Sequence, residues 1–247
     1  MKHCIKLTLS VLITYNIGYA NTLKMCQSEK DKIGGCIERI YTYSDENYNM
    51  NHVSPVIADM YEFPYKNGKL EGVAKSYGYG EIVGIYPYKN GKLNVIVIEN
   101  DSQKTQRHET PYRDGKKEGI AKFYYDDELS EEVSYKDDKI DGVVKQYLHS
   151  ILSFETSYKD GKKEGIGKGY YENGNLKRET PYKNDAIDGV EKQYYENGDL
   201  IAASTYKNEK IISGKCGDSK AFSNAHLHNL EKRYYIDSTI EEICKKP

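Results

Sequence analysis

The sequence predicts an all-β protein: an elongated single-layer antiparallel sheet of about seven tandem β-hairpin repeats, with small N- and C-terminal caps. Three observations predict this fold. A phrase that begins Tyr-Lys-Asn-Gly returns along the chain at a nearly constant interval. Tyrosine and glycine are abundant, at 25 and 21 of 247 residues, which suits half-buried strands joined by tight turns. The mean hydropathy of −0.80 is too low for a thick aliphatic core.

The first 20 residues have the pattern of a secretory signal peptide. Lys2 and Lys6 precede an apolar run over residues 7–17, and small residues lead to a cleavage point after Ala20. The alternative is an uncleaved anchor, but the apolar run is shorter than the ~20 residues needed to cross a bilayer. We therefore expect export to the periplasm, the cell surface or the medium. The formal net charge of the whole chain is only −2, which argues against a nucleic-acid partner.

Four cysteines remain after the signal peptide, two before the repeats and two after them. In an exported protein this placement predicts disulfides Cys26–Cys36 and Cys216–Cys244. Each would contribute about 3 kcal/mol by restricting the unfolded chain. Four cysteines allow other connectivities, and free thiols or a zinc site are alternatives.

The repeated phrase begins at Tyr65, Tyr88, Tyr112, Tyr135, Tyr158, Tyr182 and Tyr206. Intervals of 23 or 24 residues leave room for two strands and two turns. The array therefore covers residues 61–212. Residues 21–60 form the N-terminal cap, with a strand candidate at 37–43. Residues 213–247 form the C-terminal cap, where 231–235 suggest a degenerate last strand and 238–241 open a short helix. Residues 213–230 have no assignment.

The turns predict which residues face each other across each hairpin. Asn173-Gly174 between two strand-like runs is typical of a two-residue turn, which places Tyr171 beside Leu176. The resulting register puts an opposite-charge pair at one site in three consecutive hairpins: Lys122–Glu132, Lys145–Glu155 and Lys168–Glu179. It puts no such pair in the flanking hairpins, where Lys192 faces Ala203 and Lys75 faces Ile85.

This register separates two faces of the sheet. On the face predicted to be packed, Tyr182 faces Gly165, and Gly167 faces Thr180. The opposite face is predicted to carry a tyrosine column and a lysine column: Tyr77, Tyr124, Tyr147, Tyr170 and Tyr194, with Lys75, Lys122, Lys145, Lys168 and Lys192. The lysine column is interpreted as a solvated charged face, with an anion or lipid site as the alternative.

The unit Tyr-Lys-Asn-Gly-Lys-Leu-Glu-Gly, followed by hydrophobic-x-Lys-x-Tyr-Tyr-Glu-Asn-Gly-x-Leu, resembles the variant class of MORN repeats found in many bacterial proteins. The resemblance covers residues 61–212. It implies a sheet of successive hairpins that serves as an interaction scaffold, usually without an active site. Some relatives of this class are described as antitoxin-like, and other MORN proteins have been linked to membrane lipids. The unit at Tyr88 departs from the pattern, because Asn94-Val95 stand where Glu-Gly is expected.

No catalytic residue, metal site or cofactor is predicted. The segments 78–80 and 167–169 lack the later glycine of a phosphate-binding loop. His226 and His228 would lie on one side of a strand, but no cysteine or acidic residue stands at a recognised ligand spacing.

The leading hypothesis is an exported, non-enzymatic scaffold that binds a protein partner through one face of the sheet, since tyrosine is common in interface hot spots. The predicted contact residues are Tyr77, Tyr124, Tyr147, Tyr170, Tyr194, Lys122, Lys145 and Lys168. Peripheral attachment to anionic lipid through the lysine column is an alternative. An antitoxin or immunity role is another, which rests on the resemblance alone. The oligomeric state stays open.

Overall fold

The computed structural model describes residues 24–43, 57–101, 103–231 and 236–244. The signal peptide predicted at 1–20 lies outside these residues. The chain divides into two compact units, unit 1 at residues 1–116 and unit 2 at residues 117–247. Each unit is described by itself below.

Unit 1 begins with a short helix and continues as antiparallel strands in hairpin order. Its elements are α1 (Glu29–Gly34), β1 (Cys36–Tyr43), β2 (Ile57–Lys66), β3 (Lys69–Leu70), β4 (Gly72–Gly78), β5 (Glu81–Lys89), β6 (Lys92–Leu93), β7 (Val95–Asn100) and β8 (Gln106–Arg113). The two-residue strand β9 (Lys116–Lys117) lies at the boundary between the units. The strand expected at 37–43 is therefore present as β1.

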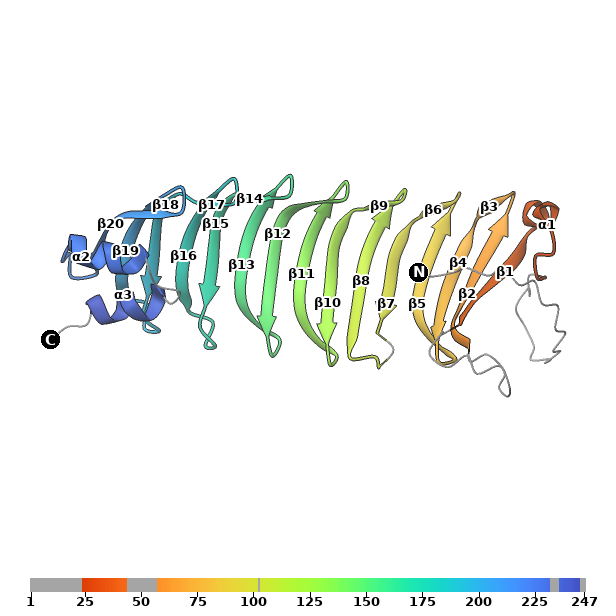
Figure 1. Ribbon diagram of the computed structural model, residues 1–247, viewed down its shortest axis with the longest axis horizontal. Helices are drawn as coiled ribbons and strands as arrows, with labels where there is room; N and C mark the ends of the chain where they lie inside the picture. The colour runs from red at the N-terminus through yellow and green to blue at the C-terminus, as the bar shows by residue number, and fades with distance from the viewer. Residues whose placement is uncertain (1–23, 44–56, 102, 232–235, 245–247) are drawn as a thin grey trace. The chain divides into compact units, whose positions relative to one another are not determined.

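Unit 2 repeats the same antiparallel order and ends in two helices (Figure 1). Its elements are β10 (Gly119–Tyr125), β11 (Glu128–Lys136), β12 (Lys139–Leu148), β13 (Ile151–Lys159), β14 (Lys162–Lys163), β15 (Gly165–Tyr170), β16 (Leu176–Lys183), β17 (Ala186–Ile187), β18 (Gly189–Tyr194), β19 (Leu200–Lys207), β20 (Lys210–Cys216), α2 (Asn224–Glu231) and α3 (Ile236–Cys244). The predicted all-β fold of tandem antiparallel hairpins with small caps is confirmed.

The Tyr-Lys phrase of each repeat makes a two-residue turn. Both central residues have positive φ, as at Asn67 (53°) and Gly68 (73°), and again at Asp137 (48°) and Asp138 (68°). A type I′ turn requires this conformation, which Asn, Asp and Gly adopt at the lowest cost. The turn chemistry therefore explains why these residue types recur at this point of the repeat.

An acidic residue ties five of these turns to a turn one repeat further along the chain. The Glu71 carboxylate accepts a hydrogen bond of 2.7 Å from the backbone N–H of Asn90, which lies 19 residues later. Glu118, Asp141, Glu164 and Asp188 accept equivalent bonds from Asp137, Asp160, Asn184 and Asn208. The acid of the Glu-Gly or Asp-Gly dipeptide therefore links consecutive repeats.

The glycine after this acid holds a strained backbone position, and Val95 occupies that position in one repeat. Gly72 and Gly119 have φ of 108° and 110°, and Val95 has φ of 75°. Because a β-branched residue is disfavoured at positive φ, we expect Val95→Gly to raise the free energy of unfolding by about 1 kcal/mol. Val95 is 64% exposed, so little packing is lost. Urea unfolding checks this.

The matched control for Val95→Gly is Val73→Gly. Val73 is also exposed, and it lies in the regular part of β4. There glycine only weakens the strand, and we expect a loss of about 1 kcal/mol. If both substitutions destabilise the protein alike, the strain argument for Val95 is wrong.

The turn at Asn173-Gly174 differs from the prediction. The Tyr171 N–H donates to the Asn175 carbonyl at 2.9 Å, so the loop has three residues and not two. Gly174 has φ of 83°, as in a hairpin loop with a glycine bulge. The expected pairing of Tyr171 with Leu176 is therefore wrong, since Leu176 faces Tyr170.

A β-bulge cancels the extra loop residue. The register shifts between Gly169 and Tyr170, and beyond the shift Lys168 faces Glu179 as predicted. The predicted pairs Lys122–Glu132 and Lys145–Glu155 are also confirmed, as are the flanking pairs Lys192–Ala203 and Lys75–Ile85.

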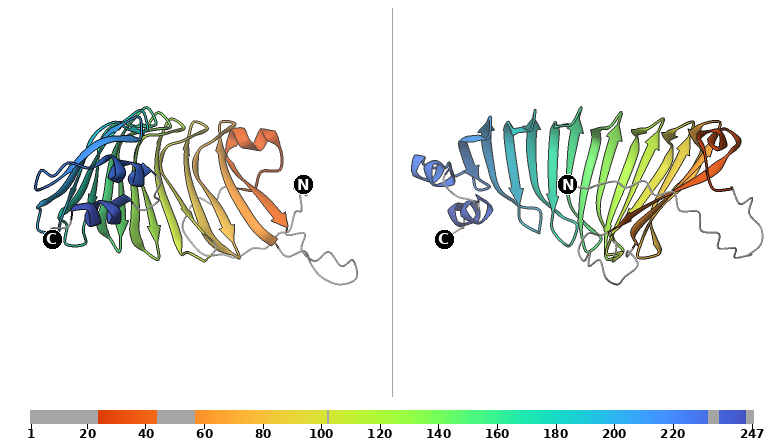
Figure 2. Two further views of the ribbon diagram at one scale, coloured as in Figure 1. Left: turned by 60° about the vertical axis from the view of Figure 1, so that its left-hand side comes forward. Right: turned by 45° about the vertical axis from the view of Figure 1, so that its right-hand side comes forward.

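The two helices of the C-terminal cap pack on one side of β19 and β20 (Figure 2). The buried cluster beneath them contains Ile201, Ala202, Tyr206, Ile211, Cys216, Phe222, Leu230, Ile240 and Cys244. The helix expected at 238–241 is confirmed within α3. The strand expected at 231–235 is wrong at Glu231, which ends α2, and its remaining residues lie outside the described part of the chain.

Each cap is joined by a disulfide to a terminal strand. Cys26 bonds to Cys36 at the start of β1, and Cys216 at the end of β20 bonds to Cys244 at the end of α3. Both predicted disulfides are thus present. On the N-terminal side the backbone of Cys26 also donates to Ile37, so residues 24–26 cover part of the outer edge of β1. Covered edges are protected from pairing with other chains.

Candidate functional site

A row of alternating charges crosses the strands of unit 2 on one face, named here the ladder face. Its members pair from strand to strand in the order Lys122, Glu132, Lys145, Glu155, Lys168, Glu179 and Lys192. Each glutamate therefore stands between two lysines. The sequence predicted the lysines and their hairpin partners, and the structure extends them into a continuous row.

The ladder glutamates also hold the tyrosine column. The hydroxyl of Tyr147 donates to Glu132 at 2.9 Å, that of Tyr170 to Glu155 at 2.7 Å, and that of Tyr194 to Glu179 at 2.9 Å. The tyrosine follows its glutamate by 15 residues each time. These hydrogen bonds join neighbouring hairpins and hold the tyrosine hydroxyl groups in place. The tyrosines that were predicted to contact a partner therefore have a structural role as well.

The ion pairs of the row are loose and half-exposed. Lys122 lies 3.8 Å from Glu132, Lys168 lies 3.7 Å from Glu155, and Lys192 lies 3.5 Å from Glu179. The lysine side chains are 42–48% exposed. An exposed ion pair contributes about 0–1 kcal/mol. The lysines therefore remain accessible while their positions across the strands are regular.

The phenols of this column are expected to resist deprotonation. Burial first, and then the hydrogen bonds to Glu132 and Glu155, raise the pKa of Tyr147 and of Tyr170 to about 12 from the ordinary 10.0. Since the folded pKa is the higher one, the stabilisation is complete below pH 10 and is lost as the pH rises toward 12.

We therefore expect the ultraviolet absorbance of tyrosinate to show a late step near pH 12 that the variant Tyr147→Phe/Tyr170→Phe lacks. In urea-unfolded protein the same difference between wild type and variant should move to about pH 10. If the absorbance of folded wild type and folded variant already differs near pH 10, the hydrogen bonds to the ladder glutamates are contradicted.

An exposed aliphatic row runs beside the ladder on the same face. Ile120 is 54% exposed, Val143 37%, Ile166 45% and Val190 48%. Each stands two residues before a ladder lysine, so strand alternation places both on one face. These four residues were not among the predicted contact residues. The recurring hydrophobic-x-Lys-x-Tyr pattern carries the signal, because its three defined positions share one face.

Of the other predicted tyrosines, Tyr124 faces Leu129 in unit 2, and Tyr77 in unit 1 has a similar local contact. Its hydroxyl donates to Glu62 at 2.8 Å, and Arg39 pairs with the same carboxylate at 2.7 Å. Burial and the Glu62 contact raise the pKa of Tyr77 to about 12. The charge row does not continue through unit 1, however, because Ile85 faces Lys75 and pairs with Ile98.

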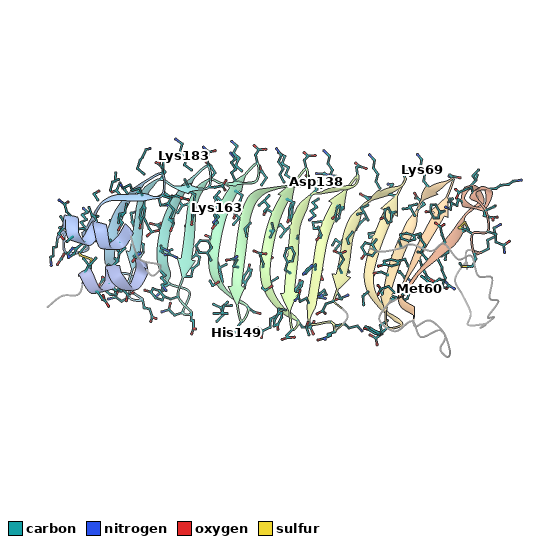
Figure 3. The ribbon with its side chains drawn as sticks, viewed as in Figure 1. Met60, Lys69, Asp138, His149, Lys163 and Lys183 are labelled. Carbon is teal, nitrogen blue, oxygen red and sulfur yellow. A yellow bond between two sulfur atoms is a disulfide. The ribbon has the colours of Figure 1, made fainter. Side chains whose placement is uncertain are left out.

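The opposite face of unit 2, named here the tyrosine face, is the packed one as predicted. It carries the anchor tyrosines Tyr135, Tyr158, Tyr182 and Tyr206. A Cβ added to Gly167 would lie 2.9 Å from the Tyr182 ring, so only glycine leaves this ring its space. The ammonium of Lys163 lies 5.0 Å from the centre of the same ring. Figure 3 shows Lys163 and Lys183 at one end of the hairpins and His149 at the other.

Residues that could ligate a metal ion are scattered through the described part of the chain. That part contains no group of three His, Cys, Asp or Glu residues that could hold a metal ion. The expectation that His226 and His228 share one side of a strand is wrong, because both lie in α2. A crevice between Lys177, Gln193 and Glu241 measures about 10 Å³, roughly the space of one water molecule.

None of the helices in the described ranges has both the length and the apolar character of a membrane span.

Comparison with known proteins gives one family match. Residues 117–137, 163–184 and 187–208 match the family described as MORN repeat variant. No curated protein matches the chain.

Two solved structures of TarM show a distant likeness. A mutant of S. aureus TarM in complex with fondaparinux, alpha-GlcNAc-glycerol and UDP is 12% identical, with a TM-score of 0.18 over 65% of this chain and 22% of that chain. A second crystal structure of TarM is 12% identical, with a TM-score of 0.17 over 66% of this chain and 22% of that one. The chain thus spans about a fifth of TarM, and neither likeness bears on its fold.

Each matched segment begins at or just after a Tyr-Lys turn, crosses the following strands, and ends at or near the next such turn. The matches therefore coincide with single hairpin repeats of unit 2, at the period read from the sequence. The resemblance to the variant class is confirmed for these three repeats. On this evidence unit 2 contains at least three MORN-variant repeats.

Proposed function

We propose that this protein is an exported, non-enzymatic scaffold that binds a protein partner through the ladder face of unit 2. One observation carries the proposal: an exposed aliphatic row, Ile120, Val143, Ile166 and Val190, lies beside a row of fixed alternating charges. A run of exposed apolar side chains rimmed by polar groups is typical of an interaction surface. The charges supply specificity, since a partner must match their alternation.

A protein partner is favoured over a lipid surface by the same charges. Attraction to anionic lipid adds about 1 kcal/mol per lysine only when the lysines act together. Here each lysine of the ladder has a glutamate on the neighbouring strand. The row as a whole therefore carries little net charge, and a membrane would gain little from it.

Export is supported by the two disulfides. Disulfides persist in oxidising compartments and are rare in the reducing cytosol. Both bonds join a cap to a terminal strand. The proposed address is therefore outside the cytosol, where a cytosolic antitoxin would not act.

The test is site-specific photocrosslinking in the native cells. A photoreactive phenylalanine analogue replaces Val143 or Ile166 on the ladder face. In the matched control it replaces His149, whose side chain is 82% exposed at a distant turn. We expect both ladder positions to give one adduct of the same mass and the control to give none. Fractionation of the same cells locates the adduct.

A second variant links the adduct to the surface. Val190→Asp on the ladder face should abolish the adduct formed at Val143 and leave the circular dichroism spectrum unchanged. If the photoreactive residue gives the same adduct at Val143, Ile166 and His149, or gives none at any of them, the ladder face does not bind a protein.

A further inference from the structure

The C-terminal cap shows what can cover the tyrosine face. On β19 and β20 the anchor Tyr206 and its neighbour Ile211 are each only 5% exposed, because α2 and α3 pack over them. From α3, Ile240 is fully buried in this contact. Figure 1 shows both helices in front of the last strands of unit 2. One end of the repeated surface thus already holds an α-helix.

The same surface continues on the preceding repeats, where the cap covers it only in part. Tyr182 and Tyr158 are the anchors one and two repeats before Tyr206, and both are only half-buried. Ile187, which faces Tyr182 as Ile211 faces Tyr206, packs partly against the cap. No described element of unit 2 lies over Tyr158. A repeat array presents equivalent surfaces at equivalent positions, so the helix-binding surface extends beyond the cap.

The preceding repeats differ in charge from the one that the cap covers. Lys177 is the bulged residue of β16, and the equivalent bulged residue of β19 is Ile201, which belongs to the cap cluster. Lys163 pairs with the anchor Tyr158, whereas Ile211 pairs with the anchor Tyr206. Each ammonium lies over an aromatic ring, with Lys177 at 5.5 Å from Tyr171 and Lys163 at 5.0 Å from Tyr182. The open surface therefore combines aromatic rings with cations.

The helix α3 places an acidic residue, Glu241, near Lys177. Glu241 lines the small crevice together with Lys177 and Arg178. The α3 sequence Ile-Asp-Ser-Thr-Ile-Glu-Glu-Ile-Cys carries isoleucines at helical spacing and acids between them. The cap thus provides an example, within this chain, of an acidic amphipathic helix on this surface.

We propose that the tyrosine face of β13–β18 is a second docking surface, which accepts an acidic amphipathic helix of a partner protein. Its apolar side packs on Tyr158 and Tyr182 as α3 packs on Tyr206, and its acids face Lys163 and Lys177. This mode of recognition places apolar anchors at helical spacing against an apolar surface. It uses the face opposite the ladder face, so either proposal can fail alone.

The probe is a fluorescein-labelled peptide of about 14 residues, long enough to form a helix. It carries isoleucine at helical spacing with glutamate beside it, and a matched peptide has lysine for every glutamate. Fluorescence anisotropy with the full disulfide-bonded chain should give a Kd on the order of 10 µM for the acidic peptide and no binding of the basic one.

Two double variants locate the site. Lys163→Glu/Lys177→Glu on the tyrosine face should weaken binding about tenfold or more. Lys159→Glu/Lys162→Glu makes the same charge change at the exposed turn between β13 and β14, and should weaken binding less than about twofold. If the first variant does not fold, Lys163→Gln/Lys177→Gln takes its place.

Three results would overturn the proposal. The first is equal weakening by both double variants, which would indicate attraction by net charge alone. The second is equal binding of the acidic and basic peptides, or no binding below about 1 mM. The third is a stable dimer in light scattering that Lys163→Glu/Lys177→Glu dissociates and the acidic peptide does not, which would place a second copy on this face.

Discussion

Replacing Glu155 by lysine is expected to lower the free energy of unfolding of unit 2 by about 2–3 kcal/mol. Glu155 lies between Lys145 and Lys168 in the ladder and accepts the hydroxyl of Tyr170 at 2.7 Å. The substitution removes a charge-assisted hydrogen bond from a half-buried phenol. It also puts three ammonium groups on adjacent strands, where like charges directly opposite each other are destabilising.

Two further variants separate these contributions. Glu155→Gln keeps an acceptor for the Tyr170 hydroxyl and removes only the charge, so its loss should be about 1 kcal/mol. In Glu155→Lys/Lys168→Glu the charges are exchanged between neighbouring strands, and part of the lost stability should return. Urea unfolding followed by circular dichroism measures all three.

The matched control is Glu172→Lys, which makes the same charge change at an exposed turn of unit 2. A surface substitution of this kind changes stability by at most about 0.5 kcal/mol. If Glu155→Lys costs no more than Glu172→Lys, the ladder makes no contribution to folding, and its lysines and glutamates are only a solvated surface.

The register of the hairpins could be predicted because independent signals agree on it. The period fixes where each turn lies, and the pair Lys122–Glu132 then recurs at the equivalent site of two further hairpins. A register shifted by one residue would move every lysine to the opposite face. Opposite charges at one site in three hairpins are therefore a check on the register that needs only the amino-acid order.

The turn at Asn173-Gly174 shows why local signals were insufficient for loop geometry. An Asn-Gly pair fits both a two-residue turn and a three-residue loop that ends in a glycine bulge. The choice depends on the strand partners, which the dipeptide does not determine. The compensating bulge in β16 concealed the difference, because it restored the same pairing of Lys168 with Glu179.

Contacts between repeats could not be predicted in the same way. The bond from Tyr170 to Glu155 spans 15 residues and joins two hairpins, and the bond from Asn90 to Glu71 spans 19. Each depends on how neighbouring hairpins lie side by side, which a single repeat does not encode. The cap was misread at Glu231 for a related reason. The amino-acid sequence that begins at Glu231 repeats that of a strand, but Glu231 itself is the last residue of helix α2.

Removal of the C-terminal disulfide is expected to have the largest effect on stability. Cys216→Ala/Cys244→Ala opens a loop whose ends are 28 residues apart, which the chain-entropy relation converts to about 3–4 kcal/mol of lost stability. Alanine is chosen because both cysteines are buried, and it leaves no unsatisfied polar group there. The N-terminal pair Cys26→Ala/Cys36→Ala is the matched control. Its ends are 10 residues apart, and the same relation gives about 2–3 kcal/mol.

Hydrogen exchange distinguishes a local loss from a global one. In a repeat array each unit contacts only its neighbours, so amides of α3, β19 and β20 should lose protection first. Amides of β10–β12 should keep theirs, because no cap residue of the buried cluster touches them. Uniform loss of protection across unit 2 would contradict this picture. Retained protection of α3 would show that Ile240 and Leu230 hold the cap on Tyr206 without the covalent bond. The protection of the α3 amides in this variant would then measure how strongly the tyrosine face binds a helix of the same chain.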